Sequence, residues 1–249
     1  MAEKRRSSKR AAKTVLIIFL LLMIAFCAWK IWSILSDYKK GNDTYEEAAS
    51  FVSIPEKEEK PVDEIDRPIV DFDALREINP DIVGWIYIED TNINYPIAQG
   101  PDNSYYLSRM YNKQWDGCGC IFMDYRNSPD FSDPNSVIYG HYVKNGSMFQ
   151  NLVGYKAQEF YETHKTAYLL TPDKNYQIIF FAGYVASLKD DAWKVDFSEE
   201  EFEPWYMKAI EQSIFDSGVV PTPQSKIITL STCSYEFNDA RFVVLGILK

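Results

Sequence analysis

The sequence predicts a mainly β domain of the barrel or sandwich type, carried behind one apolar N-terminal segment. Eight short runs rich in Ile, Val, Phe and Tyr lie between residues 85 and 248, with turn residues between them. This spacing is typical of closed or packed antiparallel sheets. The chain has 249 residues, 46% of them hydrophobic and 15% aromatic, which excludes a disordered or fibrous protein and allows one core plus an anchor.

The N-terminal segment predicts a membrane anchor over residues 14–35. Its first part, TVLIIFLLLMIAFCAW, carries no charge, and the whole run approaches the ~20 residues that cross a bilayer. Six Lys or Arg residues precede it within residues 1–13, so the positive-inside rule predicts a cytoplasmic tail and a single-pass type II protein in the cell membrane. A cleaved signal peptide is the alternative, but no small-x-small site follows the run.

Residues 36–69 are expected to form an extracellular stem, because they are charged, contain several prolines and lack sustained hydrophobic periodicity. Charge is divided unevenly along the chain. Residues 1–40 hold nine Lys or Arg against two Asp or Glu, whereas the remainder holds 17 against 34. The strong excess of acidic residues after residue 40 excludes nucleic acid as a partner, since phosphate binding needs a basic surface.

The folded domain is expected to occupy residues 70–249. The segment DFDALREINPDIVG predicts a short helix that begins at an Asp71 cap and ends before Pro80. The eight strand-like runs that follow are residues 85–90, 93–99, 119–125, 136–141, 166–170, 176–187, 226–233 and 241–248.

A helix is predicted in the connection between the sixth and seventh runs, residues 190–217. Ser198 and Glu201 have the spacing of a capping box. Apolar residues then recur at helical intervals, at Phe202, Trp205, Tyr206, Ile210 and Ile214.

The last two runs predict an antiparallel hairpin joined by residues 234–240, with backbones about 4.8 Å apart. Cys233 ends the first strand and Arg241 begins the second, so both are expected at the same edge of the sheet. A nearby positive charge favours the reactive thiolate, and an Arg can donate to the oxyanion that forms when a thiolate attacks a carbonyl. The alternative is a buried cysteine that packs as a small hydrophobic residue beside a surface Arg.

A proton carrier is needed beside such a thiol, and the chain has two histidines. His141 follows the run SVIYG at a strand end, whereas His164 lies in the polar stretch EFYETHKT, where a capping or solvent-facing role is expected. His141 is therefore the better candidate to receive and return a proton. A structural histidine in a turn remains the alternative.

The other cysteines are Cys27, Cys118 and Cys120. Cys27 lies inside the anchor, and a disulfide between residues two apart would close a strained ring. Two cysteines with two distant histidines also make a poor zinc site, so no metal or cofactor is expected. The pair at 118 and 120 is read as incidental, with a redox role as the alternative.

Together, these segments resemble the sortase family over about residues 70–249. The run TLSTC ending at Cys233, with Arg241 eight residues later, is similar to the family signature, and YGH ending at His141 resembles its histidine strand. Three features are similar to class B: the segment at residues 84–107, the motif IFMDYRN at residues 121–127, and the helix predicted within 197–216.

The resemblance implies a closed eight-stranded barrel and a membrane-anchored cysteine transpeptidase. Cys233 would attack the Thr carbonyl of a C-terminal sorting motif, of the Asn-Pro-x-Thr-Asn or x-Pro-x-Thr-Gly kind, in a surface protein. His141 would protonate the leaving amine, Arg241 would stabilise the oxyanion, and a peptidoglycan amine would resolve the thioester. Substrate-groove positions carry over to Asn103, Leu107, Ser231, Thr232, Leu188 and Trp193.

Three alternatives use the same chain differently. A cysteine peptidase would let water replace the amine, and a pilin-polymerising sortase would use a lysine of a pilin. A non-catalytic adhesive β domain would not need the thiol for turnover. Some class B members carry an acidic residue two positions after the cysteine, where this chain has Tyr235, so no carboxylate is assigned to the site.

Overall fold

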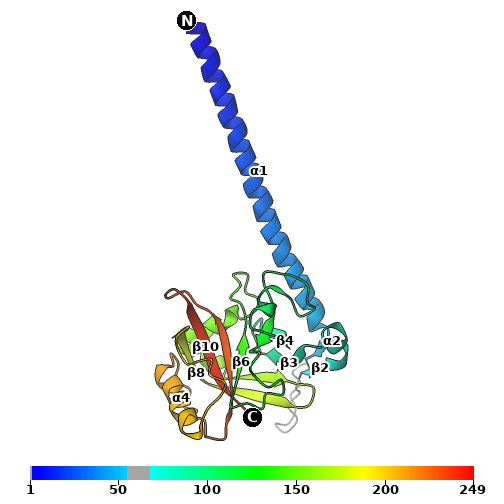
Figure 1. Cartoon of the computed structure of the whole chain (residues 1–249), viewed down its shortest axis with the longest axis vertical. Helices are drawn as coiled ribbons and strands as arrows, with labels where there is room; N and C mark the ends of the chain where they lie inside the picture. Colours follow the sequence, from blue (N-terminus) through cyan, green and yellow to red (C-terminus); the bar gives the residue numbers. More distant parts are fainter. Residues whose placement is uncertain (1, 55–67) are drawn as a thin grey trace. The chain divides into compact units, whose positions relative to one another are not determined.

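The computed structural model describes residues 2–54 and 68–249, which form two compact units, residues 1–40 and 41–249. Helix α1 runs from Ala2 to Ala49 (Figure 1). Its part from Lys13 onward is long and apolar enough to cross a membrane, by length and composition. The large apolar side chains between Val15 and Leu35 are exposed.

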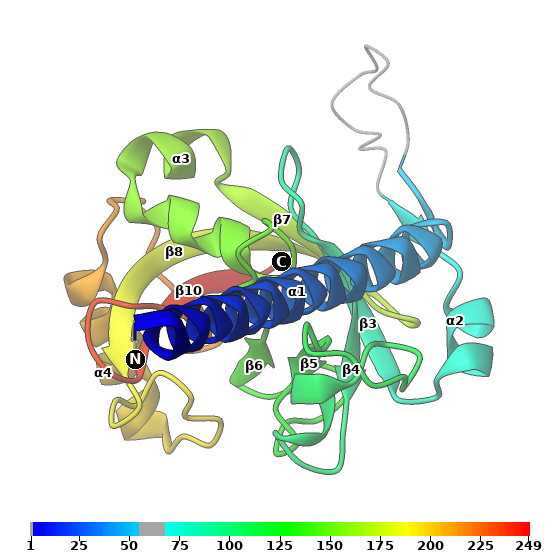
Figure 2. The same cartoon turned by 90° about the horizontal axis from the view of Figure 1, so that it is seen from above.

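Eight strands of the second unit close into a barrel, which confirms the predicted mainly β fold. Each strand overlaps one of the eight apolar runs, although β3 begins and ends earlier than predicted and β5 is shorter. Around the barrel the order is β10-β8-β7-β3-β4-β5-β6-β9, with β9 paired back to β10 (Figures 1 and 2). In chain order the strands are β3 (Ile82–Tyr87), β4 (Asn94–Gln99), β5 (Ile121–Met123), β6 (Asn135–Tyr139), β7 (Thr166–Leu170), β8 (Asn175–Ser187), β9 (Lys226–Cys233) and β10 (Ala240–Leu248).

Two neighbouring pairs in this barrel are parallel, β4 with β5 and β6 with β9, and the other pairs are antiparallel. Parallel pairing needs a long crossover, and the one from β6 to β9 includes three helices, at residues 150–156, 158–163 and 199–212. The shorter elements of the unit are β1 (Val52–Ser53), β2 (Ile69–Val70), α2 (Phe72–Ile78), η1 (Tyr105–Ser108), η2 (Gln150–Lys156), α3 (Gln158–Thr163) and α4 (Glu199–Gln212).

Both predicted helices of the domain are present. Asp71 caps α2 by accepting a hydrogen bond from the Ala74 amide, 3.0 Å away. Helix α4 begins with the predicted capping box of Ser198 and Glu201. It ends at Gln212, so Ile214, which the helical spacing included, lies beyond it. The apolar face of α4 packs beside β8 and β10, in a cluster that includes Trp205, Tyr206, Ala182, Val243 and Leu245.

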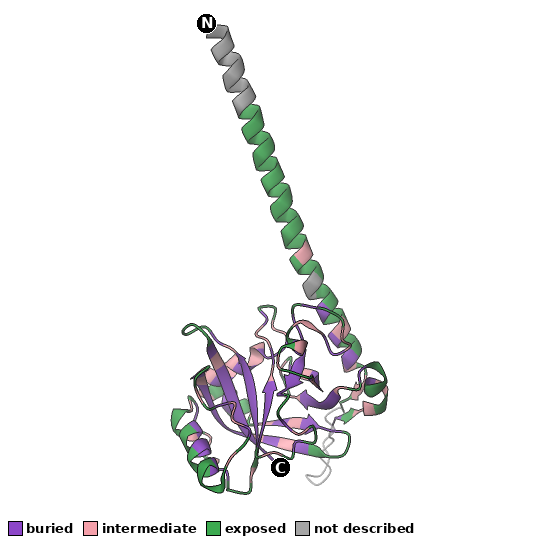
Figure 3. Cartoon of the chain, viewed as in Figure 1, coloured by how far each residue is buried: buried purple, intermediate pink, exposed green. Residues whose placement is uncertain are grey.

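Most residues of the strands are buried (Figure 3). Trp85, Phe122, Phe180 and Phe242 are among the largest side chains fully buried there. Burying apolar surface contributes about 25 cal/mol per Å², so these rings fix the barrel that positions the site.

The compact unit begins earlier than the sequence predicts. Residues 36–69 were expected to be a stem, yet α1 continues to Ala49, with Tyr45 and Ala48 buried. The Tyr45 hydroxyl donates to the Gly119 carbonyl at 2.6 Å, and its ring meets that of Tyr95 edge to face at 5.2 Å. Residues 55–67 of the expected stem lie outside the described residues.

Candidate active site

Strand register brings the three predicted catalytic residues to the adjacent ends of three neighbouring strands, with His141 two residues past the end of β6. In the parallel pair of β6 and β9, Tyr139 lies beside Ser231. His141 lies two residues after Tyr139, and Cys233 lies two residues after Ser231. In the antiparallel pair of β9 and β10, Cys233 lies opposite Arg241. Since side chains alternate along a strand, steps of two keep Ser231 and Cys233 on the same face of the sheet.

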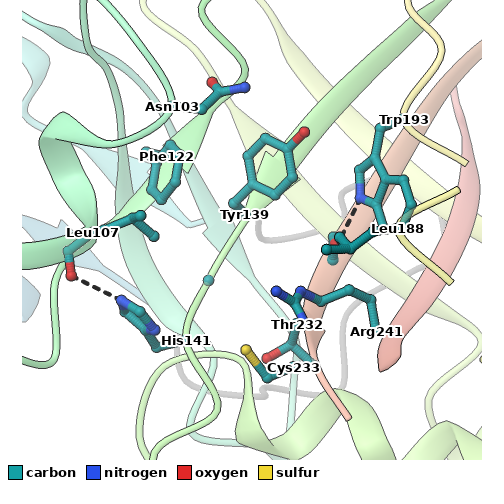
Figure 4. Close-up of a pocket in the computed structure, with 12 residues that line it drawn as sticks. Asn103, Leu107, Phe122, Tyr139, His141, Leu188, Trp193, Thr232, Cys233 and Arg241 are labelled. Atoms are coloured by element: carbon teal, nitrogen blue, oxygen red, sulfur yellow. Dashed lines mark hydrogen bonds between the residues drawn. The ribbon is translucent and has the colours of Figure 1, made fainter. Parts of the chain in front are cut away.

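A pocket of about 580 Å³ opens over these strand ends (Figure 4). All nine residues singled out from the sequence line it. In the view of Figure 4, the Cys233 sulfur lies between the His141 ring and the Arg241 guanidinium. The full lining is Asn103, Leu107, Phe122, Tyr139, Gly140, His141, Leu188, Trp193, Ser231, Thr232, Cys233 and Arg241.

His141 is oriented by Leu107, which lies in η1. Its Nε2 lies 2.8 Å from the Leu107 carbonyl oxygen, which only accepts hydrogen bonds. Nε2 therefore carries the hydrogen, and in neutral imidazole Nδ1 is left as the acceptor. This tautomer can take a proton from a thiol at Nδ1.

Arg241 is half-buried, and its Nη1 donates to the Ala240 carbonyl at 3.0 Å. A guanidinium has five N–H donors, so this contact fixes the group while leaving others for a bound oxyanion. The main-chain carbonyl thus holds the cation beside the sulfur without neutralising its charge.

The loop after Cys233 carries a polar cluster that the sequence did not predict. Ser234 donates to Glu236 at 2.6 Å and accepts from Lys156 at 2.8 Å, and Lys156 pairs with Glu236. The hydrogen bonds from Lys156 and Ser234 lower the pKa of Glu236 to about 2. The Glu236 carboxylate is therefore paired with Lys156 of η2, and this contact fixes the loop between β9 and β10.

Loops supply the remaining walls of the pocket. Trp193, from the connection between β8 and α4, donates its Nε1–H to the Ser231 hydroxyl at 3.0 Å. Leu107 and Leu188 are exposed apolar side chains at the pocket. Thr232 also lines it, but alternation along β9 turns its side chain to the face opposite Cys233.

The other cysteines and the second histidine do not line this pocket. Cys118 and Cys120 are both buried, and burial raises the pKa of the Cys120 thiol to about 12. Cys120 is therefore a neutral thiol near pH 7. His164 lies at the end of α3, where its ring stacks on Phe160 at 4.0 Å and its Nδ1 is 2.8 Å from the Thr163 hydroxyl.

Comparison with known proteins gives a consistent result. The family model described as the sortase domain matches residues 86–249, the part of the chain that forms nearly the whole barrel. A sortase B of Listeria monocytogenes is 39% identical over 175 residues, which cover 69% of this chain and 71% of that protein.

A sortase B of Staphylococcus aureus is 33% identical over 237 residues, 94% of this chain and 95% of that protein. Among solved structures, sortase B from B. anthracis in complex with AAEK1 superposes with a TM-score of 0.74 at 34% identity. The match covers 86% of this chain and 98% of that one.

Proposed function

Because the chain belongs to the sortase family, in class B, we propose that this cysteine transpeptidase attaches surface proteins to the cell wall. It cleaves a C-terminal sorting motif of the Asn-Pro-x-Thr-Asn or x-Pro-x-Thr-Gly kind after Thr. It then joins the new Thr carboxyl group to an amine of a peptidoglycan precursor. The observation that carries this proposal is that His141, Cys233 and Arg241 lie at the ends of neighbouring strands and line one pocket.

The first half of the reaction is acylation of Cys233. Its sulfur gives up a proton to Nδ1 of His141 and attacks the Thr carbonyl carbon, forming a C–S bond. The C–N bond to the following residue then breaks, and His141 returns the proton to the departing amine. The Leu107 carbonyl supports this role, because it holds the hydrogen of the imidazole on Nε2.

The second half of the reaction is resolution of the thioester by an amine. An acceptor amine attacks the thioester carbonyl, a C–N bond forms and the C–S bond breaks. The proton that the amine loses passes through His141 to the departing sulfur, which restores the starting enzyme.

Arg241 acts in both halves, because each passes through a tetrahedral oxyanion. Its guanidinium is fixed by the Ala240 carbonyl and lies opposite the nucleophile. Donors that are already in place stabilise the developing charge without reorganisation.

The apolar part of α1 supports anchoring in the cell membrane, with the catalytic unit outside. Residues 14–35 supply the span, and the six basic residues before it favour a cytoplasmic tail of residues 1–13. This type II arrangement would hold the enzyme on the side of the membrane where the cell wall is made.

The test is product analysis with the full chain in detergent, a peptide containing one of these motifs, and triglycine as the amine. We expect a ligated product and a thioester on Cys233 by mass spectrometry, both lost in Cys233→Ala. Hydrolysed product alone at high triglycine would instead support a cysteine peptidase. Ligation only to a pilin lysine would support a pilin-polymerising enzyme.

A further inference from the structure

Asp124 is a buried carboxylate that the proposed reaction does not use. It follows β5 in the motif IFMDYRN, and its side chain has no exposed surface. Both Nε and Nη2 of Arg126 donate to it at 2.8 Å. It also accepts from the Asn103 amide at 3.0 Å and from the Tyr139 hydroxyl at 2.8 Å. Asn103 and Tyr139 both line the active-site pocket.

This carboxylate is ionised in the folded chain. Burial raises the pKa of Asp124, but hydrogen bonds from Arg126, Tyr139 and Asn103 lower it by more than burial raises it. The resulting pKa is below the usual range. A buried charge destabilises a fold unless partners compensate it, and removing one partner leaves it uncompensated. Each partner of Asp124 therefore helps to stabilise the buried charge, and the network behind the pocket depends on all of them.

Arg126 extends the network to the opposite wall. Its Nη2 also donates to the Trp193 carbonyl at 2.9 Å, in the connection between β8 and α4. The Trp193 indole in turn donates to Ser231, two residues before the nucleophile. One ion pair thus joins two loops that line the pocket from distant parts of the sequence.

The same network fixes which way the Asn103 amide points. Its oxygen accepts from the Tyr125 amide at 3.0 Å, and one N–H donates to Asp124. A carboxamide has two N–H donors, so the second one is left for a bound peptide. Asn103 is therefore set to donate to an acceptor such as a peptide carbonyl.

We propose that Asp124 and Arg126 are positioning residues for peptide binding: they hold Asn103 and the Trp193 loop as two fixed walls of the substrate pocket. This inference rests on the proposed function, because it assigns the pocket to the sorting peptide. It predicts that loss of the ion pair weakens peptide binding and leaves the chemistry of Cys233 intact.

The experiment compares Arg126→Met, Arg126→Lys and a matched control, Lys165→Met, in the full chain in detergent. Lys165 pairs with Glu162 on the surface, and neither residue lines the pocket. We expect KM for the sorting peptide to rise about tenfold or more in Arg126→Met, because Asn103 and Trp193 lose the contacts that hold them in place for the peptide. The value of kcat should change by less than about twofold. Arg126→Lys should recover part of the loss, and the control should match wild type.

Loop position is measured separately, with trypsin and no substrate. Lys189 and Lys194 flank the Trp193 loop, so cleavage there should become faster in Arg126→Met but not in Lys165→Met. Combining Arg126→Met with Trp193→Ala should raise KM less than the sum of the two effects predicts, since both act on one wall.

Unchanged trypsin cleavage at Lys189 and Lys194 in Arg126→Met would overturn the inference, and so would an unchanged KM. A fall in kcat with unchanged KM would also overturn it. If the wild-type chain turns over no sorting peptide, the proposed function fails by itself. The trypsin comparison then still decides whether Arg126 holds the loop.

Discussion

Arg241 lies directly opposite Cys233 in the antiparallel ladder of β9 and β10. Main-chain pairing therefore sets the separation of the two Cα atoms, and the hydrogen bond from Arg241 Nη1 to the Ala240 carbonyl orients the guanidinium. The hairpin loop that joins them is fixed in turn by the contact of Lys156 with Ser234 and Glu236.

Replacing Arg241 with alanine should lower turnover of a sorting peptide by about 10²–10³, the loss seen when one oxyanion donor is removed. Arg241→Lys should be intermediate, because a lysine keeps the charge but not the planar group of donors. The control is Lys226→Ala, at the other end of β9. Near-normal turnover in Arg241→Ala would contradict the oxyanion role.

Replacing His141 with alanine should lower turnover by at least about 10²-fold, since proton transfer is lost. His164→Ala is the matched control, because the second histidine packs on Phe160 and does not line the pocket. Initial rates with saturating peptide provide the measurement. Equal losses in both variants would indicate a folding effect and not a catalytic one.

The packing of Tyr45 predicts where the chain can be shortened. A chain that begins after residue 35 should remain active, whereas one that begins at residue 50 should lose stability, because Tyr45 and Ala48 are buried. Tyr45→Ala should cost about 3 kcal/mol of unfolding free energy, and Tyr45→Phe about 1 kcal/mol. Thermal unfolding provides the measurement, with exposed Glu46→Ala as control. An unchanged melting temperature in Tyr45→Ala would contradict this packing.

Gly119 and Gly117 form a matched pair of glycines. Gly119 has φ +62°, and a Cβ there would lie 2.7 Å from the Leu107 carbonyl oxygen, whereas a Cβ at Gly117 meets nothing within 4 Å. Gly119→Ala should therefore cost at least about 1–2 kcal/mol and lower activity, since Leu107 orients His141. Gly117→Ala should resemble wild type in unfolding and peptide-cleavage assays. Equal behaviour of the two variants would contradict the close packing.

Acid unfolding should depend on Asp124. Its pKa is lowered in the folded chain, so its stabilising contribution is present above the unfolded-state pKa of about 3.9 and is lost as pH falls through the folded value. Removing its main partner in Arg126→Met should raise that folded pKa and move acid unfolding to higher pH. Fluorescence measured along a pH titration tests this, with Lys165→Met as control. A transition that does not move would mean that Asp124 gains little from Arg126.

Local sequence patterns predict much of this structure. All eight apolar runs overlap strands, and Ser198 caps α4 as its spacing indicates. The pairing of Cys233 with Arg241 also follows from sequence, because a short loop between two strands produces a hairpin. These features depend on neighbours within a few residues of one another.

Features that depend on distant contacts could not be read in this way. His141 reaches Cys233 through the parallel pairing of β6 with β9, which no local pattern specifies. The motif IFMDYRN is visible in the sequence, but the role of Asp124 depends on Arg126 contacting Trp193, 67 residues away. Tyr45 lies in a charged segment with too few apolar residues to show helical periodicity, although its ring is buried.

The parallel pairing of β6 with β9 places the reacting groups and the residues that select the substrate on different parts of the chain. The reacting groups lie on or next to hydrogen-bonded strands, whereas the pocket residues within 103–107 and 188–193 belong to segments that connect strands. Substrate selection can therefore diverge between relatives through residues 188–193, whereas residues 103–107 are constrained because the Leu107 carbonyl orients His141. Exchanging residues 188–193 alone for their counterpart from another member is a direct route to an enzyme with a new target and an unaltered reaction.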